Sequence, residues 1–436
     1  MDKAKNIKRL MFGGILFAIS IPMLLTFYPI MDFEPLNGSF EEKVKPELNF
    51  DDLYSGKYQK LMEEYLNDNT GGRPYLVRIN NQMEWWLFKA TNVESVVIGK
   101  ENYLYEQSYI DAYYGTDFIG DDVVKEKMRK LARVRDTLES RGVKLVVAIA
   151  PGKGSFYPEY FPAEVKTKMQ RTNYQAYKEA FEKTNIPFVD FRSWFESMKS
   201  TSKYPLFPKG GIHWSSYGEI LAADSLIKRI NGLTTDSQMN SIHIDFFKSA
   251  QSAYYRDEDI EESMNLLFNL DDGTLGYPVH NVIKHKASRT TQLLTIADSY
   301  FWDMHHWRSN GYFTNGQFWY YNREVYPDFY AKETFVQDFV DLRYEVEKND
   351  VVLIMFTDAN LKDFAYDFID RLYDEYCSNG REKREKRIAK IIEDIRNTPD
   401  WINYVKKQAQ NEGISLEEAL RKNAVYMMIQ EEKKKR

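Results

Sequence analysis

Strands and helices are predicted to alternate along the middle of the chain. Residues 143–150 form an apolar run interrupted only by Lys144, and further strands are predicted at residues 187–191, 292–297 and 351–356. Such runs are typical of parallel strands that are covered on both faces. Helical patterns separate and follow them, at residues 121–141, 172–184, 215–229, 334–346 and 361–376. This alternation predicts an α/β fold built on a doubly wound parallel sheet.

Other patterns lie around and within this unit. Residues 95–105 read as a β-hairpin, with a β-branched run, a polar turn and an aromatic run. Residues 233–285 interrupt the alternation with aromatic and acidic residues, which indicates an insertion or lid. Residues 378–436 are strongly charged and helical, and one helix carries an apolar stripe formed by Ile388, Ile391, Ile392 and Ile395. We expect a C-terminal helical appendage with an assembly or docking role, or one of structural packing alone.

A membrane anchor is predicted near the N-terminus. Residues 10–31 carry no charge and are long enough to cross a bilayer of about 30 Å as one helix. Basic residues precede this segment and acidic residues follow it, so the positive-inside rule places residues 1–9 in the cytoplasm. The chain is then a single-pass protein of the cytoplasmic (inner) membrane. Residues 32–92 form a membrane-proximal neck, and residues 93–377 form an extracytoplasmic domain. A cleaved signal peptide is the alternative, but no small-x-small cleavage pattern follows the apolar run.

Composition excludes several classes of function. The chain has 59 Lys+Arg against 65 Asp+Glu, a formal charge of −6, which argues against a nucleic-acid partner. Its single cysteine, Cys377, rules out an intrachain disulfide framework and a multi-thiolate metal site. Adjacent histidines such as His305 and His306 rarely bind one ion together. We therefore expect neither a metal nor a cofactor.

A serine and a histidine are the candidate catalytic residues. Ser299 follows the apolar run at residues 292–297, where a sharp turn can expose a hydroxyl beside backbone N–H groups, an arrangement suited to acyl transfer. The alternative is that Asp298 and Ser299 only cap a helix. His213 lies in a glycine-rich loop before a helical pattern, which makes it the most promising of the six histidines.

These residues belong to an ordered set of short motifs that resembles the alginate O-acetyltransferase type of SGNH hydrolase-like proteins. The resemblance covers about residues 93–360. The motifs are Val97-Ile98-Gly99, Ile149-Ala150-Pro151-Gly152-Lys153, Gly211-Ile212-His213-Trp214 and Ala297-Asp298-Ser299. As in that family, and in contrast to ordinary SGNH esterases, the histidine motif precedes the serine motif. The resemblance implies that Ser299 is the nucleophile of a covalent acetyl-enzyme and that His213 is its base.

Two positions depart from the family pattern. Gly211 stands where the family has an aspartate two residues before the histidine, and Ala297 stands where it has a glycine. Without an orienting carboxylate the site would be a slow dyad or inactive, unless another residue supplies one. Four aspartates are candidates by chain position, and Asp298 is counted among the catalytic residues: Asp190, Asp298, Asp303 and Asp358.

Substrate contacts are predicted at five further positions. The resemblance places Lys153 and Tyr157 at the active edge of the sheet, although a solvated lysine is the alternative for Lys153. Asn322 could donate to an oxyanion and Arg323 could contact a charged group, unless they only follow a buried strand. Trp214, which follows the histidine, is the fifth candidate.

The expected function is therefore a membrane-anchored, extracytoplasmic O-acetyltransferase or acetylesterase that acts on a cell-surface or exported polysaccharide. The family implies a multispanning membrane acyltransferase as the partner that delivers the acetyl group. One alternative is a non-catalytic, glycan-binding or scaffold subunit of a polysaccharide modification complex. A plain secreted esterase is another.

Overall fold

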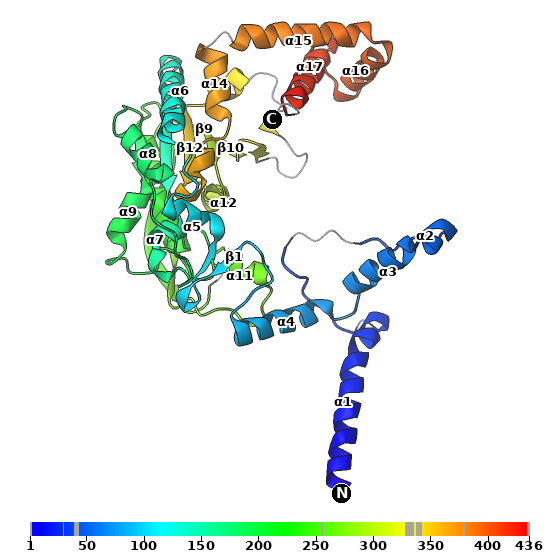
Figure 1. Cartoon of the computed structure of the whole chain (residues 1–436). Coiled ribbons are helices and arrows are strands. Elements are labelled where there is room, and N and C mark those ends of the chain that lie inside the picture. The colour runs from blue at the N-terminus through cyan, green and yellow to red at the C-terminus, as the bar shows by residue number, and fades with distance from the viewer. Residues whose placement is uncertain are drawn as a thin grey trace.

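A mixed six-stranded sheet lies at the centre of the computed structural model, which describes residues 2–28, 30–38, 43–253, 256–327, 335–336, 342–377 and 380–433. The strands are β3 (Lys144–Ala150), β4 (Phe188–Asp190), β9 (Leu293–Ala297), β10 (Gly316–Tyr320), β11 (Glu324–Tyr326) and β12 (Val351–Thr357). They lie in the order β11-β10-β9-β12-β3-β4, and only the edge pair β10 and β11 is antiparallel. The predicted α/β fold with a parallel sheet is confirmed (Figure 1).

Both faces of this sheet are buried, which explains the apolar runs. In β3, Val146 and Ala148 belong to one core, whereas Val147 and Ile149 belong to a second core on the other face. The first core also takes side chains from α9 (Phe191–Met198), α10 (Ser216–Asn231) and α12 (Phe301–His306). The second takes them from α6 (Asp121–Ser140), α8 (Asn173–Phe181) and α14 (Phe368–Cys377).

The strand order brings three distant segments to one edge of the sheet. β12 is the last of these strands in sequence, yet it lies between β3 and β9 and runs parallel to both. The residues that follow the three strands, Pro151, Asp298 and Asp358, therefore come together at the carboxyl end of the sheet. This is the edge at which open α/β sheets bind their ligands.

The predicted hairpin forms. β1 (Val96–Ile98) and β2 (Leu104–Glu106) pair antiparallel and α5 (Gln107–Tyr114) follows them, whereas α7 (Lys153–Phe156) follows β3. The insertion contains a long antiparallel ribbon of β6 (Ser241–Ala250) and β7 (Leu275–Ile283), with the short helix α11 (Asp259–Met264) between them. The short strands β5 (Ser237–Gln238) and β8 (Arg289–Thr290) pair beside it.

Two predicted helices differ in extent. The helix expected at residues 361–376 begins only at Phe368, because Ala365 and Tyr366 have positive φ angles of 55° and 49° and interrupt the helical path. The helix expected at residues 334–346 lies partly outside the described residues; of those described, Phe335 forms an isolated β-bridge with Glu324, and residues 342–346 belong to α13 (Leu342–Glu347).

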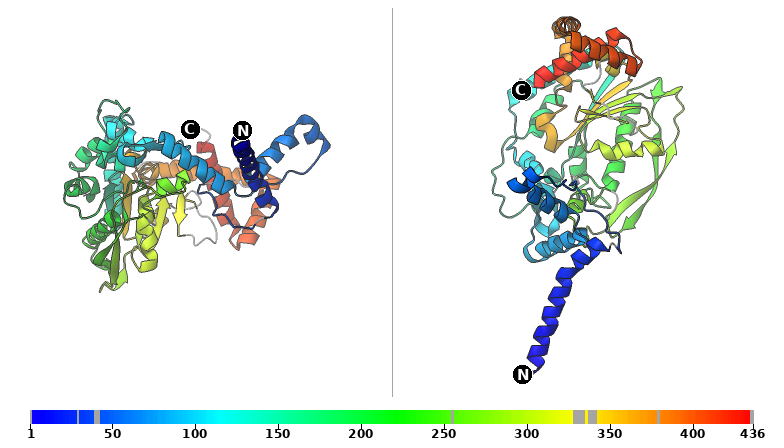
Figure 2. Two further views of the ribbon diagram at one scale, coloured as in Figure 1. Left: turned by 90° about the horizontal axis from the view of Figure 1, so that it is seen from below. Right: turned by 90° about the vertical axis from the view of Figure 1, so that its right-hand side faces the viewer.

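The two ends of the chain leave the domain on different sides (Figures 1 and 2). At the N-terminus, α1 (Asp2–Phe27) contains the one described helix, at residues 5–27, that is long and apolar enough to cross a membrane. It ends four residues before the predicted limit, since Tyr28 precedes a proline. The helices α2 (Phe50–Ser55), α3 (Lys57–Asp68) and α4 (Arg73–Phe88) follow.

At the C-terminus, α15 (Gly380–Asn397), α16 (Pro399–Glu412) and α17 (Leu416–Lys433) pack around a core of their own. Three of the four isoleucines of the predicted stripe, Ile388, Ile391 and Ile395, are buried in that core, and the fourth, Ile392, packs against it.

Candidate active site

Ser299 lies immediately beyond the carboxyl end of β9. All five residues of β9 are buried, and the chain then turns sharply so that Trp302 N donates a hydrogen bond to Ser299 O at 3.1 Å. α12 begins at Phe301, only two residues after the serine. The half-buried Ser299 side chain therefore stands between a rigid strand and a short helix, which fixes its backbone.

His213 meets Ser299 from a different part of the chain. The loop before α10 brings Nε2 of its imidazole to 2.8 Å from Ser299 Oγ, a hydrogen-bond distance. The Tyr300 hydroxyl supports this loop by donating to Ile212 O at 2.9 Å. The structure thus brings together the two residues singled out by the sequence, at the distance that proton transfer needs.

Asp259 is the carboxylate that orients His213. It belongs to α11 in the insertion, and its Oδ2 accepts a hydrogen bond from His213 Nδ1. Its other oxygen accepts from Ile212 N at 2.8 Å. The carboxylate on Nδ1 places the proton there and leaves Nε2 as the acceptor for Ser299. Sequence reasoning missed Asp259, which is 46 residues from His213.

The candidates named for this role were wrong, because each is engaged elsewhere. Asp298 is fully buried and accepts hydrogen bonds from Tyr300 N, Thr357 N and Asn360 Nδ2 at 3.1, 2.7 and 2.9 Å. It ties the end of β9 to the end of β12. Asp303 pairs with Arg256 at 2.8 Å.

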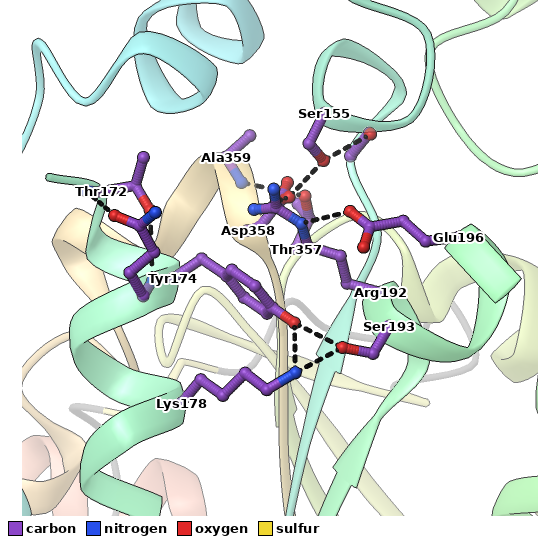
Figure 3. Close-up of polar contacts among 12 residues, drawn as sticks. Ser155, Thr172, Tyr174, Lys178, Arg192, Ser193, Glu196, Thr357, Asp358 and Ala359 are labelled. Carbon is purple, nitrogen blue, oxygen red and sulfur yellow. Dashed lines mark hydrogen bonds and ion pairs between the residues drawn. The ribbon is translucent and has the colours of Figure 1, made fainter. Parts of the chain in front are cut away.

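The remaining two candidates make polar contacts near α8, α9 and the end of β12, where Figure 3 labels Asp358 together with Arg192, Tyr174 and Lys178. Asp358 hydrogen-bonds Ser155 and pairs with Arg192 at 2.9 Å. Asp190 accepts from Tyr174 and pairs with Lys178 at 3.1 Å. Both carboxylates therefore stabilise the helices that flank the sheet.

The close packing around Gly211 explains why this position carries no aspartate. A Cβ atom there would lie 2.7 Å from Asp257 O and 2.9 Å from the Pro208 ring. Real Cβ atoms essentially never approach backbone atoms that closely, so the position accepts only glycine without a shift. The insertion backbone that excludes a side chain at Gly211 is the same segment that delivers Asp259.

Lys153 supports the histidine loop from beneath. Its side chain is fully buried, and Nζ donates to Lys209 O at 2.6 Å and to Gly211 O at 2.7 Å. Burial lowers the pKa of Lys153 to about 7, against the attraction of Asp259 and Asp272. The prediction of a ligand contact was wrong, as was the alternative of a solvated lysine, because no part of the side chain reaches solvent.

The other predicted contacts are placed differently from what the sequence suggested. Trp214 is 1% exposed and packs on Tyr300 with ring centroids 5.2 Å apart, so it is a core residue and the prediction of a substrate contact was wrong. Tyr157 packs in an aromatic cluster with Tyr103 and Tyr160.

The turn between β10 and β11 carries the predicted Asn322 and Arg323. Asn322 is 7% exposed; its Nδ2 donates to Asp367 Oδ1 at 2.7 Å, and its buried Oδ1 has no hydrogen-bond partner among the described residues, whereas Arg323 is exposed. Tyr321, the residue before Asn322, is half-buried, and burial together with the charge of Asp298 raises its pKa. Its φ of 51° is a conformation rare for non-glycine residues.

The electrostatics of the site stabilise the protonated form of His213 relative to an isolated imidazole. Burial pulls the pKa of His213 down, but the charge and hydrogen bond of Asp259 outweigh it, and the pKa lies above its ordinary value. The pKa of Asp259 is lowered although burial opposes this, since His213, the Ile212 N–H and Lys153 all stabilise its charge. Within the described ranges, no group of three or more His, Cys, Asp or Glu side chains is arranged to hold a metal ion.

Comparison with known proteins supports the predicted resemblance. Residues 96–256 match the family model described as an SGNH hydrolase-like domain of the acetyltransferase AlgX. A probable alginate O-acetylase AlgJ of Pseudomonas syringae pv. tomato is 24% identical over 208 residues, 48% of this chain and 49% of that protein. The Azotobacter vinelandii protein of the same name is 23% identical over 240 residues, 53% of this chain and 54% of that protein.

Solved structures also match this chain in part. The O-acetyltransferase domain of Pseudomonas putida AlgJ matches with a TM-score of 0.42 at 17% identity, over 64% of this chain and 99% of that one. Bacillus cereus PatB1 matches with a TM-score of 0.39 at 12% identity, over 63% of this chain and 99% of that one.

The resemblance to SGNH hydrolase-like proteins of the AlgJ and AlgX type is thus confirmed. This chain spans about half the length of the curated relatives it matches. The match to the family model includes His213 but ends at residue 256. Asp259 and Ser299 lie beyond it, so their roles rest on the geometry described above.

Proposed function

We propose that this chain, with its SGNH hydrolase-like domain, is an O-acetyltransferase that works through an acetyl-enzyme on Ser299. The observation that carries the proposal is the hydrogen-bonded line Ser299–His213–Asp259 at the carboxyl end of the sheet. This line supports an enzyme over a non-catalytic subunit, because a binding module has no need of a serine, an imidazole and a carboxylate held in this order.

The first half of the reaction loads the enzyme. Ser299 Oγ attacks the carbonyl carbon of an acetyl donor while His213 Nε2 takes the hydroxyl proton. The oxyanion forms beside backbone N–H groups of the turn after β9. When the tetrahedral intermediate collapses, the bond to the donor oxygen breaks and His213 returns the proton to that leaving group. Asp259 holds the imidazole and stabilises its charge throughout.

The second half transfers the acetyl group. A sugar hydroxyl gives its proton to His213 Nε2 and attacks the acetyl carbon, and Ser299 leaves and recovers the proton. The product is an O-acetylated glycan and free enzyme. Water in place of the sugar would give an acetylesterase by the same steps, so the acceptor alone distinguishes the two activities.

We further propose that the acceptor is a cell-surface or exported polysaccharide and that a multispanning membrane acyltransferase delivers the acetyl group. The relatives named as probable alginate O-acetylases support this substrate class. α1 anchors the chain in the inner membrane, with its N-terminus inside and the domain outside. The apolar stretch at residues 5–27 and the basic residues before it support this placement.

The acetyl-enzyme can be tested directly. The purified full-length chain in detergent is mixed with an activated acetyl ester, and release of the leaving group is followed on the millisecond scale. We expect a burst close to one equivalent and an acetyl group on the peptide that contains Ser299. Ser299→Ala should abolish both. Ser309→Ala, which changes an exposed serine on the turn after α12, is the matched control and should keep both.

The acceptor and the orientation need separate measurements. Acetyl transfer to a panel of deacetylated polysaccharides, compared with release of free acetate, separates the transferase from the esterase. For the orientation, Cys377 is a natural reporter because it is the one cysteine and is exposed. A membrane-impermeant maleimide should label it in spheroplasts, and absence of labelling until lysis would contradict an outward-facing domain.

A further inference from the structure

α4 exposes an apolar face. Six large hydrophobic side chains are each between 41% and 65% exposed: Tyr75, Leu76, Ile79, Met83, Trp86 and Leu87. At 100° per residue they share one arc of about 120° that contains no polar residue. Phe268 of the insertion, 60% exposed, extends the face by stacking on Trp86 with centroids 5.8 Å apart. Soluble surfaces rarely leave such a stripe uncovered.

The opposite side of α4 is fixed to the domain. Trp85 is 4% exposed and belongs to the first core of the sheet. Gln82 is 2% exposed and accepts from Leu267 N and Phe268 N at 3.1 Å each, and Asn81 Nδ2 donates to Met264 O at 2.8 Å. The domain therefore does not cover the apolar arc, because α4 packs against the domain through other residues.

The beginning of α4 is joined to the end of the candidate membrane span. Gly71 N donates to Thr26 Oγ1 at 2.7 Å, and a Cβ atom at Gly71 would lie 2.3 Å from the Leu25 backbone. Arg78 holds the intervening segment by donating to Glu34 O and Pro35 O at 2.8 Å each. α4 runs across the axis of α1 at the side of the domain from which α1 projects (Figures 1 and 2).

We propose that α4 lies in the surface of the bilayer, with its apolar arc inserted among the lipids at the headgroup level. This inference rests on the proposed anchoring by α1. A helix fixed at the end of a membrane span and lying across it is at the height of the lipid headgroups. Tyr75 and Trp86 are the residue types that favour this layer. With α1 and α4 both in the membrane, the domain is held in one orientation instead of swinging on a flexible tether.

The test measures the depth of labelled positions in the full chain. In a Cys377→Ser background, single cysteines replace Ile79 or Met83 on the arc, Val123 on α6 and Gly14 in α1, and each carries a nitroxide. Val123 is the matched control, since it is an apolar residue that is 51% exposed on the domain. A Cβ atom at Gly14 would meet no described atom within 4 Å, so a label fits there. Each labelled protein must melt like its parent.

The proteins are reconstituted in vesicles of phosphatidylethanolamine and phosphatidylglycerol, and collision with oxygen and with a water-soluble nickel chelate is measured. We expect the oxygen-to-nickel ratio at positions 79 and 83 to exceed that at position 123 several-fold. High nickel accessibility at positions 79 and 83 with a buried label at position 14 overturns the inference and leaves the anchor intact. High nickel accessibility of the label at position 14 overturns the proposed membrane anchor as well. If the labels at positions 79 and 83 are accessible to nickel in vesicles but inaccessible in native membranes, the apolar arc binds a protein partner. This result also overturns the inference.

Discussion

Asp259 holds the imidazole of His213 from 46 residues further along the chain. Its two oxygens are both used, one by His213 Nδ1 and the other by Ile212 N, the backbone next to the histidine. The carboxylate therefore fixes the ring and the loop that carries it at the same time. An insertion that looked like a lid in the sequence supplies a part of the site.

Removing this carboxylate should cripple the chemistry without unfolding the protein. We expect Asp259→Asn to lower the rate of the acetyl-ester burst by about 10³–10⁴-fold, as the loss of the orienting aspartate does in well-studied serine hydrolases. The burst rate of the full-length protein is the measurement. Asp271→Asn, an exposed aspartate of the same insertion, should be unaffected. A loss of less than tenfold at Asp259 would exclude it as the orienting residue.

Introducing an aspartate at position 211 should not restore the activity of Asp259→Asn. Gly211→Asp in the Asp259→Asn background puts a Cβ atom 2.7 Å from Asp257 O, so the histidine loop must shift. We expect the double variant to be less stable than Asp259→Asn in thermal melts and no faster in the burst. Recovery of the burst rate would mean that the loop adapts more easily than its packing indicates.

The pH dependence of the burst should report the state of His213. Its pKa is raised because the charge and hydrogen bond of Asp259 outweigh the effect of burial. The reaction needs the neutral imidazole, so the rate should fall as the pH drops through a value above about 6.5. Asp259→Asn should move this acid limb to lower pH. An acid limb that stays in place in this variant would point to another titrating group.

Lys153→Met should destabilise the protein in a pH-dependent way. The variant leaves the carbonyls of Lys209 and Gly211 without their donor, at a cost of about 1–3 kcal/mol. The pKa of Lys153 is lowered to about 7, against about 10.4 in an unfolded chain. Between these values the unfolded chain binds the extra proton, so Lys153 adds stability as the pH rises. Urea unfolding at pH 7 and pH 9 should show the free energy of unfolding of the parent rising relative to that of the variant, and a fall would contradict the buried, neutral amine.

The C-terminal helices should be dispensable for the chemistry. α15, α16 and α17 bury Ile395, Val405 and Leu420 against one another rather than in the main cores. Deletion of residues 381–436 should keep the acetyl-ester burst, and we expect it to reduce co-purification with membrane proteins. Lost turnover in a truncated chain that still melts cooperatively would contradict a docking role.

The sequence predicted those features of the structure that are marked by a pattern of neighbouring residues. The runs that became β3 and β12 were recognised because both faces of those strands are buried, which leaves all but their end positions apolar. Ser299 and His213 were found because each sits in a short pattern of its own. Asp259 carries no such pattern, and only the missing aspartate at Gly211 indicated that another carboxylate must come from elsewhere.

The predicted ligand contact of Lys153 was wrong because its sequence position did not reveal its burial. Its position after a strand, at the edge where ligands bind, favoured a contact with ligand or solvent. Burial of a lysine depends on what covers it, here the loop at residues 209–211, and that packing is set by the tertiary fold.

Gly211 and Asp259 are linked by more than proximity, because the same stretch of backbone fills the space beside one and presents the other. A single substitution therefore cannot move the carboxylate from position 259 to position 211. An aspartate at position 211 has no room while the insertion backbone keeps its present path, and loss of Asp259 alone leaves the imidazole without a carboxylate. A search that demands an acidic residue two positions before the histidine would therefore discard chains of this kind as inactive. The acidic residue to look for in them follows the histidine, on an insertion that approaches a glycine.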